Sequence, residues 1–475
     1  MKRNQTYPIC LLTLLLAGCV AAPNYQHPVA EVPLKWQSES PWRDANPQDA
    51  LPKGAWWKIY ENETLNNLQQ RALEHNQTVA IARARLIQIR ALAQSSEAST
   101  LPRLDFIGRT GRQQPSENRA TYSANPVTAI PQSEHALNLT VSYELDLFGR
   151  VASDVAASLA NAQQAQSELE NTLLVLSADL ATLYFNLCAT DTEIDVVQEG
   201  VALQERAISL LVARHEGGIS SGFDQSQQQV QLDATRTQLA LLNRQRLQIE
   251  HAIATLLGTP ASNLQLATKP LQSSTRLPVL PVLLPSDILE RRPDVSSAER
   301  AVAAANAQIG VARSAAFPSI TLGAGTGLQS RTIENLLTAS SSLWSFGSSI
   351  AYNLFDGGRN KALLQASKAA HEASIANYRQ TVLRAFQEVE DGLGSLQALD
   401  KARQYAQSSI VSSQQVLDIA TYRYQGGAAT YLEIVTAQQN MLNNQRLAAQ
   451  LLGQQLTTTA FLAKALGGSI ETKSN

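Results

Sequence analysis

The chain has 475 residues, enough for several ordinary domains, with a formal net charge of −2 and only 16% charged residues. The absence of a basic stripe argues against a nucleic-acid-binding protein, because such proteins present a positively charged surface. The charged fraction is below the roughly 25% of ordinary soluble domains, and Ala, Gln, Ser and Leu take its place. No stretch reaches the ~20 apolar residues of a membrane-spanning helix, so helices are not expected to cross a membrane.

The N-terminus predicts secretion followed by lipid attachment. Two basic residues precede the apolar run Ile9–Leu16, which is too short for an anchor helix and is typical of a secretory signal. The run ends in "LAGC", which resembles a bacterial lipoprotein signal. Cys19 is therefore predicted to be acylated and to become the first mature residue, and Val20 favours sorting to the outer membrane. The alternative is an ordinary signal peptide with an incidental cysteine. The mature chain would keep one further cysteine, Cys188, whose apolar helical neighbours predict burial.

An alternating segment and its repeat predict four β-strands. "ALNLTVSYELDLFGR" (Ala136–Arg150) alternates apolar and polar residues, as does a strand with one apolar and one polar face. "SFGSSIAYNLFDGGR" repeats it 209 residues later, and the same offset relates "RHEGG" to "RYQGG" and "LLG" to "ALG". Upstream the offset is 216, between "LPRLDFIGRTG" and "FPSITLGAGTG". Constant offsets indicate a tandem duplication in which the loops differ by seven residues.

Each copy is predicted to contain a helical stretch, two strands and two long helices. Apolar residues keep heptad spacing from Leu169 to Leu211 and again from Leu232 to Leu256, which is typical of helices packed as a coiled coil. A continuous helix from Arg150 to Arg214 would be about 96 Å long, so an elongated helical structure is expected.

The repeats and the composition predict the domain boundaries. They are a signal peptide at 1–18, a lipid-anchored N-terminal extension at 19–60, a first repeat at 61–268, a Pro-rich linker at 269–286, a second repeat at 287–468 and a tail at 469–475. The first helical stretch of each repeat is expected at 64–98 and at 287–315.

Four strands per chain are too few to close a barrel. In lipid every backbone group must be paired, so strands cross only as closed barrels, and bacterial barrels have at least eight strands. The chain would then form a dimer with eight strands or a trimer with twelve; the alternative is a soluble sheet with one face on a core. In the barrel, the polar face would line the lumen with Asn138, Thr140, Ser142, Glu144 and Asp146.

Four motifs carry a family resemblance. "YELDLFGR", "YNLFDGGR", "LPSDILERRPDV" (Leu284–Val295) and "WWKIYENETLNNL" (Trp56–Leu68) resemble the TolC-like outer-membrane efflux proteins, above all their lipoprotein branch, which serves resistance-nodulation-division pumps. The resemblance covers residues 19 to about 468. It implies a mixed α and β fold: a homotrimer with a twelve-stranded transmembrane β-barrel, continuous with a periplasmic α-helical barrel of coiled-coil helices and a mixed equatorial belt.

The resemblance also implies a function and a location. The function is that of a passive duct, which receives substrate from an inner-membrane pump through a periplasmic adaptor and releases it outside the cell. The location is the outer membrane of a Gram-negative cell, where the barrel and the lipid on Cys19 both contact outer-membrane lipid.

In each copy the two long helices are expected to join at a Gly-Gly pair, Gly217–Gly218 in "RHEGG" and Gly426–Gly427 in "RYQGG". By position, the resemblance implies a periplasmic gate at these two turns. Asp224 and Tyr424 match closing contacts, and Glu433 matches one position of an acidic ring. The second ring position falls on Thr436, and the arginine of the closing contacts falls on Ala429, so the sequence departs from the family there. Three symmetric carboxylates at a constriction would favour cations. The alternatives are a helix N-cap for Asp224, interface packing for Tyr424 and a solvated charge for Glu433.

The sequence contains no recognisable catalytic or metal-binding constellation. The six histidines lack metal-ligand spacing, and "HE" at 371–372 lacks the second histidine of a zincin. "GAGTG" (Gly323–Gly327) lacks a phosphate-loop lysine and predicts close strand contacts, while "ERRPD" predicts capping and ion pairing at a helix entry. We expect no enzyme and no cofactor apart from the lipid. Two other classes remain open: a duct for a protein-secretion exporter, and a periplasmic coiled-coil scaffold without a pore.

Overall fold

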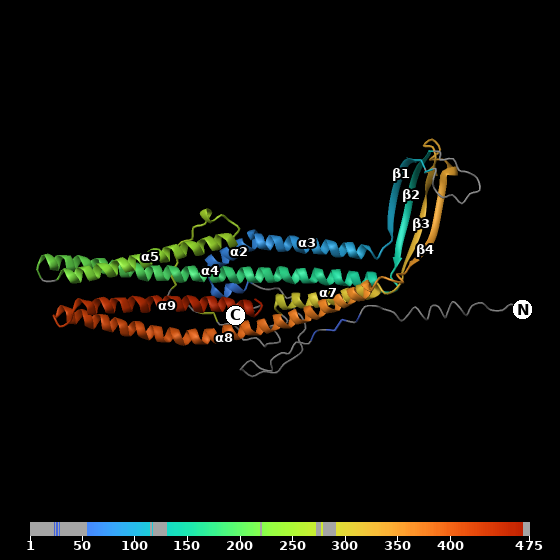
Figure 1. Ribbon diagram of the computed structural model, residues 1–475. Coiled ribbons are helices and arrows are strands. Elements are labelled where there is room, and N and C mark those ends of the chain that lie inside the picture. Colours follow the sequence, from blue (N-terminus) through green and yellow to red (C-terminus); the bar gives the residue numbers. More distant parts are fainter. Residues whose placement is uncertain are drawn as a thin grey trace. The chain divides into compact units, whose positions relative to one another are not determined.

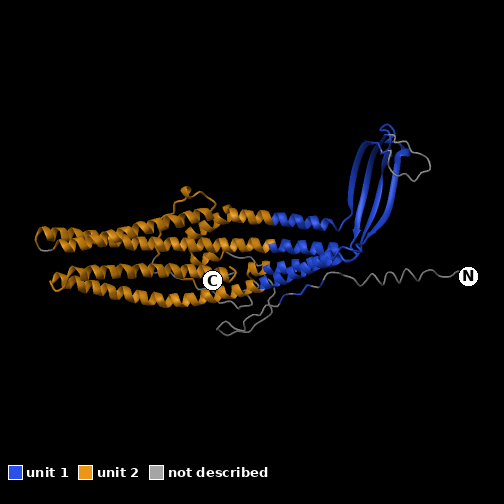
Figure 2. Ribbon diagram, in the orientation of Figure 1, with its two compact units in different colours: residues 1–29, 86–164, 298–378 blue, residues 30–85, 165–297, 379–475 orange. Residues whose placement is uncertain are grey.

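The computed structural model (Figure 1) describes residues 23, 25, 26, 28, 55–114, 116, 131–218, 221–271, 277–278 and 291–468. The chain divides into two compact units, coloured in Figure 2. Unit 1 comprises residues 1–29, 86–164 and 298–378, and unit 2 comprises 30–85, 165–297 and 379–475. Each unit contains residues from both sequence repeats. The domain boundaries expected from the sequence are not tested by this division and stay predictions.

The helices recur at the two offsets found in the sequence. At an offset of 216, α3 (Gln77–Ala98) matches α7 (Pro293–Ser314), with 22 residues each. At an offset of 209, α4 (Arg150–Glu216) matches α8 (Arg359–Gln425), with 67 residues each, and α5 (Gly222–Leu256) matches α9 (Tyr431–Ala465), with 35 residues each. The duplication and the long continuous helices are thereby confirmed.

The first helical stretch, expected at 64–98, is divided in two. It consists of α2 (Glu63–His75) and α3, separated by Asn76 in an extended conformation. The remaining short elements are 3-10 helices: η1 (Trp56–Tyr60), η2 (Ala261–Asn263) and η3 (Ala339–Ser341). Asn76 stops α2 and starts α3, because its side-chain oxygen accepts the backbone N–H of Val79 at 3.0 Å, as an N-cap does.

Unit 1 contains an antiparallel sheet of four strands in the order β1-β2-β3-β4 (Figure 1). The strands are β1 (Arg103–Gln113), β2 (Gln132–Leu145), β3 (Ser319–Ser330) and β4 (Ser342–Ala351). The prediction of two strands per copy is therefore confirmed. Gly327 allows β3 to approach β2 closely, because a Cβ there would overlap the carbonyl oxygen of Leu137.

The register places most of the apolar residues of the four strands on one face; Ile107 and Leu343 lie on the other, in register with Asn138 and Gly327. Opposed residues of an antiparallel sheet share a face, and Leu137 lies opposite Leu328. The face comprises Leu104, Phe106, Leu137, Leu139, Val141, Tyr143, Leu145, Ile320, Leu322, Ala324, Leu328, Trp344, Phe346 and Ile350. Trp344 and Phe346 are 82% and 76% exposed. Among the described residues no core covers them, contrary to the alternative of a soluble sheet packed on a core.

Unit 2 has its core where α4 packs against η1, α2, α5 and α9. Leu180 and Ile253 are fully buried there, and the indole N–H of Trp56 donates to the Ser177 hydroxyl at 2.9 Å. Cys188 lies in the same core as predicted, and burial raises the pKa of its thiol to about 11. One window of α4 is long and apolar enough to cross a membrane, but 61% of it is buried in the protein, as expected of a core helix.

Both copies end in the same backbone contact within unit 2. Gly258 follows α5 with a φ of +66°, and Gly467 follows α9 with a φ of +83°, values that favour glycine. A Cβ at Gly258 would overlap the carbonyl oxygen of His75, and one at Gly467 would lie 2.9 Å from the carbonyl oxygen of Arg291. His75 and Arg291 are themselves 216 residues apart. The "LLG" and "ALG" motifs therefore end each copy against the start of its own α3 or α7.

Replacement of Gly258 by alanine should destabilise the protein more than replacement of Gly218. Both have positive φ, +66° and +74°, which costs an L residue about 1–2 kcal/mol. Only Gly258 is also blocked by backbone, whereas no described atom lies within 4 Å of a Cβ at Gly218. We expect a loss of about 1 kcal/mol for Gly218→Ala and at least twice that for Gly258→Ala, measured by urea unfolding followed by circular dichroism. Equal losses would contradict the close contact.

Candidate functional site

The polar face of the sheet carries three of the residues predicted to line a lumen. Asn138, Thr140 and Ser142 lie on it, each opposite a glycine of β3. The absence of side chains on these glycines leaves room for neighbouring polar groups, since a Cβ at Gly327 would overlap the side-chain oxygen of Asn138 and one at Gly325 would lie 3.2 Å from the hydroxyl of Ser345. This placement agrees with the alternation of the sequence. A lumen needs further copies of the chain, and the lining role stays a prediction.

Glu144 and Asp146 have local partners that the alternation did not predict. The two carboxylate oxygens of Glu144 accept from Arg150, each at 2.7 Å. Asp146 follows the end of β2, and its carboxylate accepts the backbone N–H groups of Val151 at 3.1 Å and Ala152 at 2.7 Å. The assignment of Asp146 to the polar face of the strand is therefore wrong, because this carboxylate caps the start of α4.

The second copy caps its helix from a shifted position. Asp356 accepts the backbone N–H of Gly358 and that of Asn360, both at 2.9 Å. Asn360 is the counterpart of Val151 at the offset of 209. The counterpart of Asp146 is position 355, so Asp356 lies one residue after it. The helix start needs an acceptor for its unpaired N–H groups, and a carboxylate reaches them from either position.

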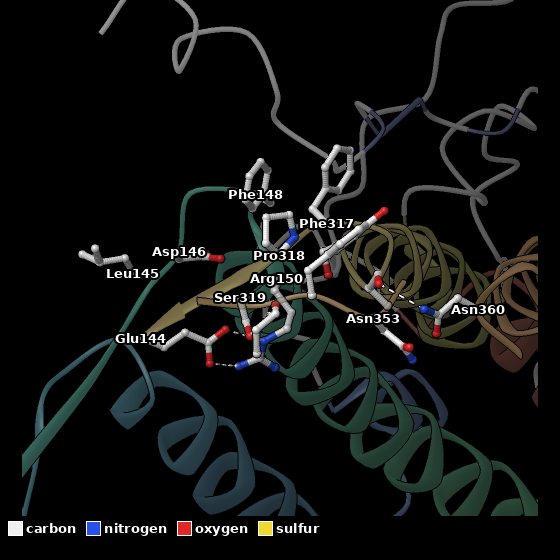
Figure 3. Close-up of a pocket in the computed structure, with 14 residues that line it drawn as sticks. Glu144, Leu145, Asp146, Phe148, Arg150, Phe317, Pro318, Ser319, Asn353 and Asn360 are labelled. Carbon is white, nitrogen blue, oxygen red and sulfur yellow. Dashed lines mark hydrogen bonds and ion pairs between the residues drawn. The ribbon is translucent and has the colours of Figure 1, made fainter. Parts of the chain in front are cut away.

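An open pocket of about 550 Å³ lies where the strands of unit 1 meet the helices (Figure 3). The Glu144–Arg150 pair lines it together with the rings of Phe148 and Phe317, which stack at 4.8 Å with 9° between their planes. No group of three or more His, Cys, Asp or Glu within the described residues could hold a metal. The pocket lies where the β2–α4 connection of the first copy meets the α7–β3 and β4–α8 connections of the second copy.

Asp224 lies in the first turn of α5, next to the α4–α5 turn of unit 2. The N-cap of this helix is Ser221, so the alternative reading of Asp224 as the N-cap is wrong. Its charge still suits the position, because the positive end of the helix dipole stabilises a carboxylate there. Burial raises the pKa of Tyr431 to about 12, and the charges of Tyr424 and Asp224 add to the effect.

Tyr424 packs between the two helix hairpins within the chain. Its ring meets that of Tyr431 edge to face at 5.3 Å, and the guanidinium of Arg214 lies 5.5 Å from its centroid, a cation–π geometry. The hydroxyl of Tyr431 donates to the side-chain oxygen of the buried Gln228 at 3.0 Å. These contacts join α4, α5, α8 and α9 beside the two turns.

Glu433 forms an ion pair that sequence reasoning missed. Arg423 donates to its carboxylate at 2.9 Å and also donates to the carbonyl of Ala428 at 3.3 Å. Arg423 therefore balances the charge of Glu433 inside each chain and binds the α8–α9 turn. The signal was present in "RYQGGAATYLE", where an arginine and a glutamate flank a Gly-Gly turn. The structure places Asp224, Tyr424 and Glu433 beside the same pair of turns, and their gating role stays a prediction.

The "ERRPD" motif forms a buried clamp in unit 2. Arg292, 4% exposed, donates to Asp294 at 2.7 and 3.0 Å, to Glu388 at 2.7 Å and to the Ala465 carbonyl at 3.1 Å. Burial alone would lower the pKa of Arg292, but its two carboxylate partners outweigh burial and raise it. In the first copy the counterpart is Asn76, whose amide donates to the carbonyl of Leu256 at 2.8 Å. Capping and ion pairing are thus the observed roles of the motif.

Cys19 lies outside the described residues, and its acylation stays a prediction. The described residues that follow it contact α7 within unit 1. The amide of Asn306 donates to the carbonyl of Pro23 at 3.1 Å, and the hydroxyl of Tyr25 donates to Glu299 at 3.2 Å. This part of the N-terminal extension is therefore bound to the helix that precedes β3.

A sequence profile described as "Outer membrane efflux protein" matches residues 68–259 and 284–468. The chain belongs to the outer membrane efflux protein family. Over 465 residues it is 31% identical to the toluene efflux pump outer membrane protein TtgC of Pseudomonas putida, covering 97% of this chain and 94% of that relative. Over 470 residues it is 30% identical to the pyoverdine export outer membrane protein OpmQ of Pseudomonas aeruginosa, covering 98% and 97%.

Solved structures agree with this assignment. The open MtrE outer membrane channel of Neisseria gonorrhoeae matches with a TM-score of 0.79 and 27% identity, covering 95% of this chain and 99% of that one. The outer membrane protein VceC of Vibrio cholerae matches with a TM-score of 0.80 and 27% identity, covering 88% and 99%. The efflux-channel fold, with long helices and a small four-stranded sheet, is thereby confirmed. The family is one of transport channels and not of enzymes.

Replacement of Arg292 by asparagine, the residue of the first copy, should destabilise the protein. It would leave the carboxylates of Asp294 and Glu388 without their cation. Removing one partner of a buried ion pair costs about 3 kcal/mol. The Asp294 and Glu388 side chains are 27% and 20% exposed. An unpaired carboxylate at low exposure has a raised pKa. The loss, measured by urea unfolding, should therefore shrink as pH falls and both carboxylates bind protons.

Two further variants complete this test. Arg292→Asn combined with Asp294→Asn and Glu388→Gln should recover most of the loss. Arg236→Gln breaks the exposed Arg236–Glu205 pair, whose side chains are 49% and 48% exposed, and should cost less than about 1 kcal/mol. A loss for Arg292→Asn that matches this control, or that does not change with pH, would contradict the clamp.

Proposed function

We propose that the chain is the outer-membrane duct of a tripartite efflux pump. As a homotrimer, it would passively conduct small toxic compounds or drugs from an inner-membrane pump and a periplasmic adaptor to the exterior. The observation that carries this proposal is the uncovered apolar face of a sheet with two free edges. The family assignment adds support, because one relative is named as a toluene efflux pump outer membrane protein and another as a pyoverdine export outer membrane protein.

The apolar face has the height of a membrane band. From Leu137 to Leu145, eight residue steps cover about 27 Å along β2, close to the ≈25 Å apolar band of outer-membrane barrels. Towards the loop end of the sheet the same face becomes polar, with Thr110 opposite His135 and Arg112 opposite Ser133. The band is therefore bounded, as expected of a strand that enters and leaves lipid.

Closure of the sheet requires more than one chain. The free edges of β1 and β4 would leave backbone groups unpaired in lipid, which only a closed barrel avoids. Two copies would supply eight strands and three would supply twelve. Membership of the family supports the trimer. In either barrel the polar face, with Asn138, Thr140 and Ser142, would surround a water-filled lumen.

The proposed cargo follows the names of the relatives. TtgC is named for toluene and OpmQ for pyoverdine, so small organic compounds are the class that we propose. The described polar face offers hydroxyls, amides, backbone and the charged side chains of Arg103 and Asp105, which lie opposite Ser142 and Thr140. Selection of the compound would then take place in the inner-membrane pump, which also supplies the energy. A protein-secretion duct is the second candidate on fold alone.

Cys19 would carry a lipid in this proposal. Its support is the "LAGC" sequence together with the binding of Pro23 and Tyr25 to α7, which brings the mature N-terminus to the unit that contains the sheet. A single acyl chain holds a protein only marginally. The barrel would hold the protein in the membrane, and the lipid would assist sorting and assembly.

The purified full-length protein tests the function. It should require detergent for extraction, migrate as a heat-modifiable trimer, conduct ions in a planar bilayer and restore drug efflux to a strain without its own duct. Cys19→Ala should lose incorporated palmitate but keep the trimer and its conductance. A soluble monomer after removal of residues 1–19 would contradict the duct and favour the scaffold. Export of a protein but of no small compound would favour the secretion duct.

Asp224→Ala and Tyr424→Ala should each raise single-channel conductance several-fold, because in the proposed gate these side chains form the contacts that close the helix turns. Tyr424→Phe keeps the ring contacts with Tyr431 and Arg214 and should behave as wild type if ring packing closes the mouth. Asp233→Ala is the matched control, since it removes a carboxylate nine residues further along α5. Unchanged conductance and drug uptake in both Ala variants of the gate would reject the assignment.

A further inference from the structure

A second pocket lies within unit 2, between α4, the connection from η1 to α2, and the segment that follows α5. Its volume is about 480 Å³, which is within the range of small-molecule sites. The rings of Tyr60, Tyr184 and Phe185 line its inner part, and Thr268 and Lys269 line its exposed rim. Neither the duct nor the gate proposed above uses this pocket.

The inner wall of the pocket is aromatic. The ring of Phe185 lies 4.5 Å from that of Tyr60, with 54° between their planes, and 5.5 Å from that of Tyr184, with 64° between their planes. Tyr184 and Phe185 are 2% and 4% exposed. Rings tilted in this way present both faces and edges to one space, which suits a further planar ring. The wall therefore favours a flat aromatic ligand.

The polar groups of the wall have spare donors. The side-chain oxygen of Asn62 already accepts the backbone N–H of Leu65 and the hydroxyl of Tyr184, both at 3.1 Å. Within the part of the chain that the structure describes, the amide nitrogen of Asn62 has no acceptor. The hydroxyl of Tyr60 reaches the carbonyl of Leu456 at 3.5 Å, longer than an ordinary O–H···O bond. A ligand that supplies acceptor oxygens would complement these donors.

The rim of the pocket carries an unpaired positive charge. The ammonium of Lys269 donates to the hydroxyl of Thr64 at 3.4 Å, and it pairs with no carboxylate of the described residues. The nearby Asp191 is occupied, because its two oxygens accept from Arg246 at 2.7 Å and from the backbone N–H of Lys269 at 2.9 Å. No acidic residue is among the described residues that line the pocket. The rim therefore attracts an anion.

Cys188, which also lines the pocket, shows how far this charge acts. Burial raises the pKa of its thiol to about 11, and the positive charge of Lys269 acts against this rise. A negative group within the pocket would be stabilised by the same charge. It would also lose its hydration if it were placed deep among the rings. The favourable place for an anionic group is thus the rim, with the apolar part of the ligand inside.

We propose that this pocket binds a small aromatic carboxylate, with its ring between Tyr60, Tyr184 and Phe185 and its carboxylate at Lys269. The carboxylate accepts a charge-assisted hydrogen bond from the ammonium. The ring removes apolar surface of the wall from water. All the described residues of the site belong to unit 2 of one chain, so the site does not depend on the pore or on the number of subunits.

The duplication shows that the aromatic wall is not needed to build the helix that carries it. At the offset of 209, the counterparts of Tyr184 and Phe185 are Leu393 and Gly394. The second copy nevertheless forms α8 with the same 67 residues as α4. The rings are therefore a feature of the first copy, and we expect one site per chain.

Binding would also stabilise the segment that follows α5. This segment is held on α4 by the backbone N–H of Lys269, which donates to Asp191, and by that of Leu271, which donates to the hydroxyl of Thr192 at 2.7 Å. A ligand between the rings and Lys269 adds a contact to the same attachment. Because the ligand binds the folded chain, it should raise the midpoint of urea unfolding.

Equilibrium dialysis of radiolabelled benzoate against the purified full-length protein tests the proposal, with protein-free detergent as the blank. Saturable binding of about one benzoate per chain is expected, as one pocket per chain requires. Benzamide keeps the ring without the charge, and acetate keeps the charge without the ring. Each should compete about tenfold more weakly than unlabelled benzoate, because each lacks one of the two interactions.

Two variants at the rim locate the site. Lys269→Met keeps the length of the side chain and removes the ammonium, so it should weaken benzoate binding about tenfold. Thr268→Trp places a large side chain at the opening and should abolish binding. Both residues are exposed, and neither variant should shift the urea midpoint measured without ligand. Lys401→Met, at an exposed lysine of α8, is the matched control and should bind benzoate as wild type does.

Three results would overturn the proposal. One is the lack of saturable benzoate binding above the detergent blank. Another is equal affinity in Lys269→Met and Lys401→Met, which would remove the carboxylate from the rim. The third is competition by acetate as strong as that by benzoate, which would leave an ion pair without the aromatic wall. Because none of these measurements uses conduction, failure of the duct and failure of this site are seen separately.

Discussion

Backbone hydrogen bonding within lipid is the constraint on which the rest of this structure depends. A sheet with one apolar face cannot enter a membrane while its edges are unpaired, because each unsatisfied backbone group there costs several kcal/mol. The chain has four strands with β1 and β4 at the edges, and its apolar face is uncovered among the described residues. Duplication has doubled the number of strands from two to four, but the edges of β1 and β4 remain. Association of copies would pair these edges, since a closed barrel has none.

The two copies keep the same backbone contacts but hold them with different side chains. Asn76 and Arg292 both donate to the last carbonyl of a terminal helix, yet only Arg292 needs carboxylate partners. A second difference follows from the chain path. Arg246 binds Asp191 at 2.7 Å, and this carboxylate also accepts the backbone N–H of Lys269 in the segment after α5. The counterpart of Arg246 is Gln455, whose side-chain oxygen accepts from Arg403 at 3.4 Å.

The helix turns show how far a family resemblance extends and where it stops. It placed Asp224, Tyr424 and Glu433 at the turns, and the structure has them there. It could not supply the partner of Glu433, because Arg423 meets it only after the chain reverses at Gly-Gly. The carboxylate of Glu433, from which an acidic ring was expected, is therefore already paired with the guanidinium of Arg423 within each chain. The cation preference of such a mouth would be weaker than that of three free carboxylates.

By itself, the sequence determined which residues form strands and long helices, which face of each strand is apolar, and that the chain is a duplicated unit with offsets of 209 and 216. These are consequences of periodicity, which acts over neighbouring residues and is visible without a fold. Only the tertiary structure decided that Asp146 caps a helix, that Glu144 is paired with Arg150 and that Asn76 divides a helical stretch. A carboxylate takes the nearest donor in space, and that donor depends on where the chain turns.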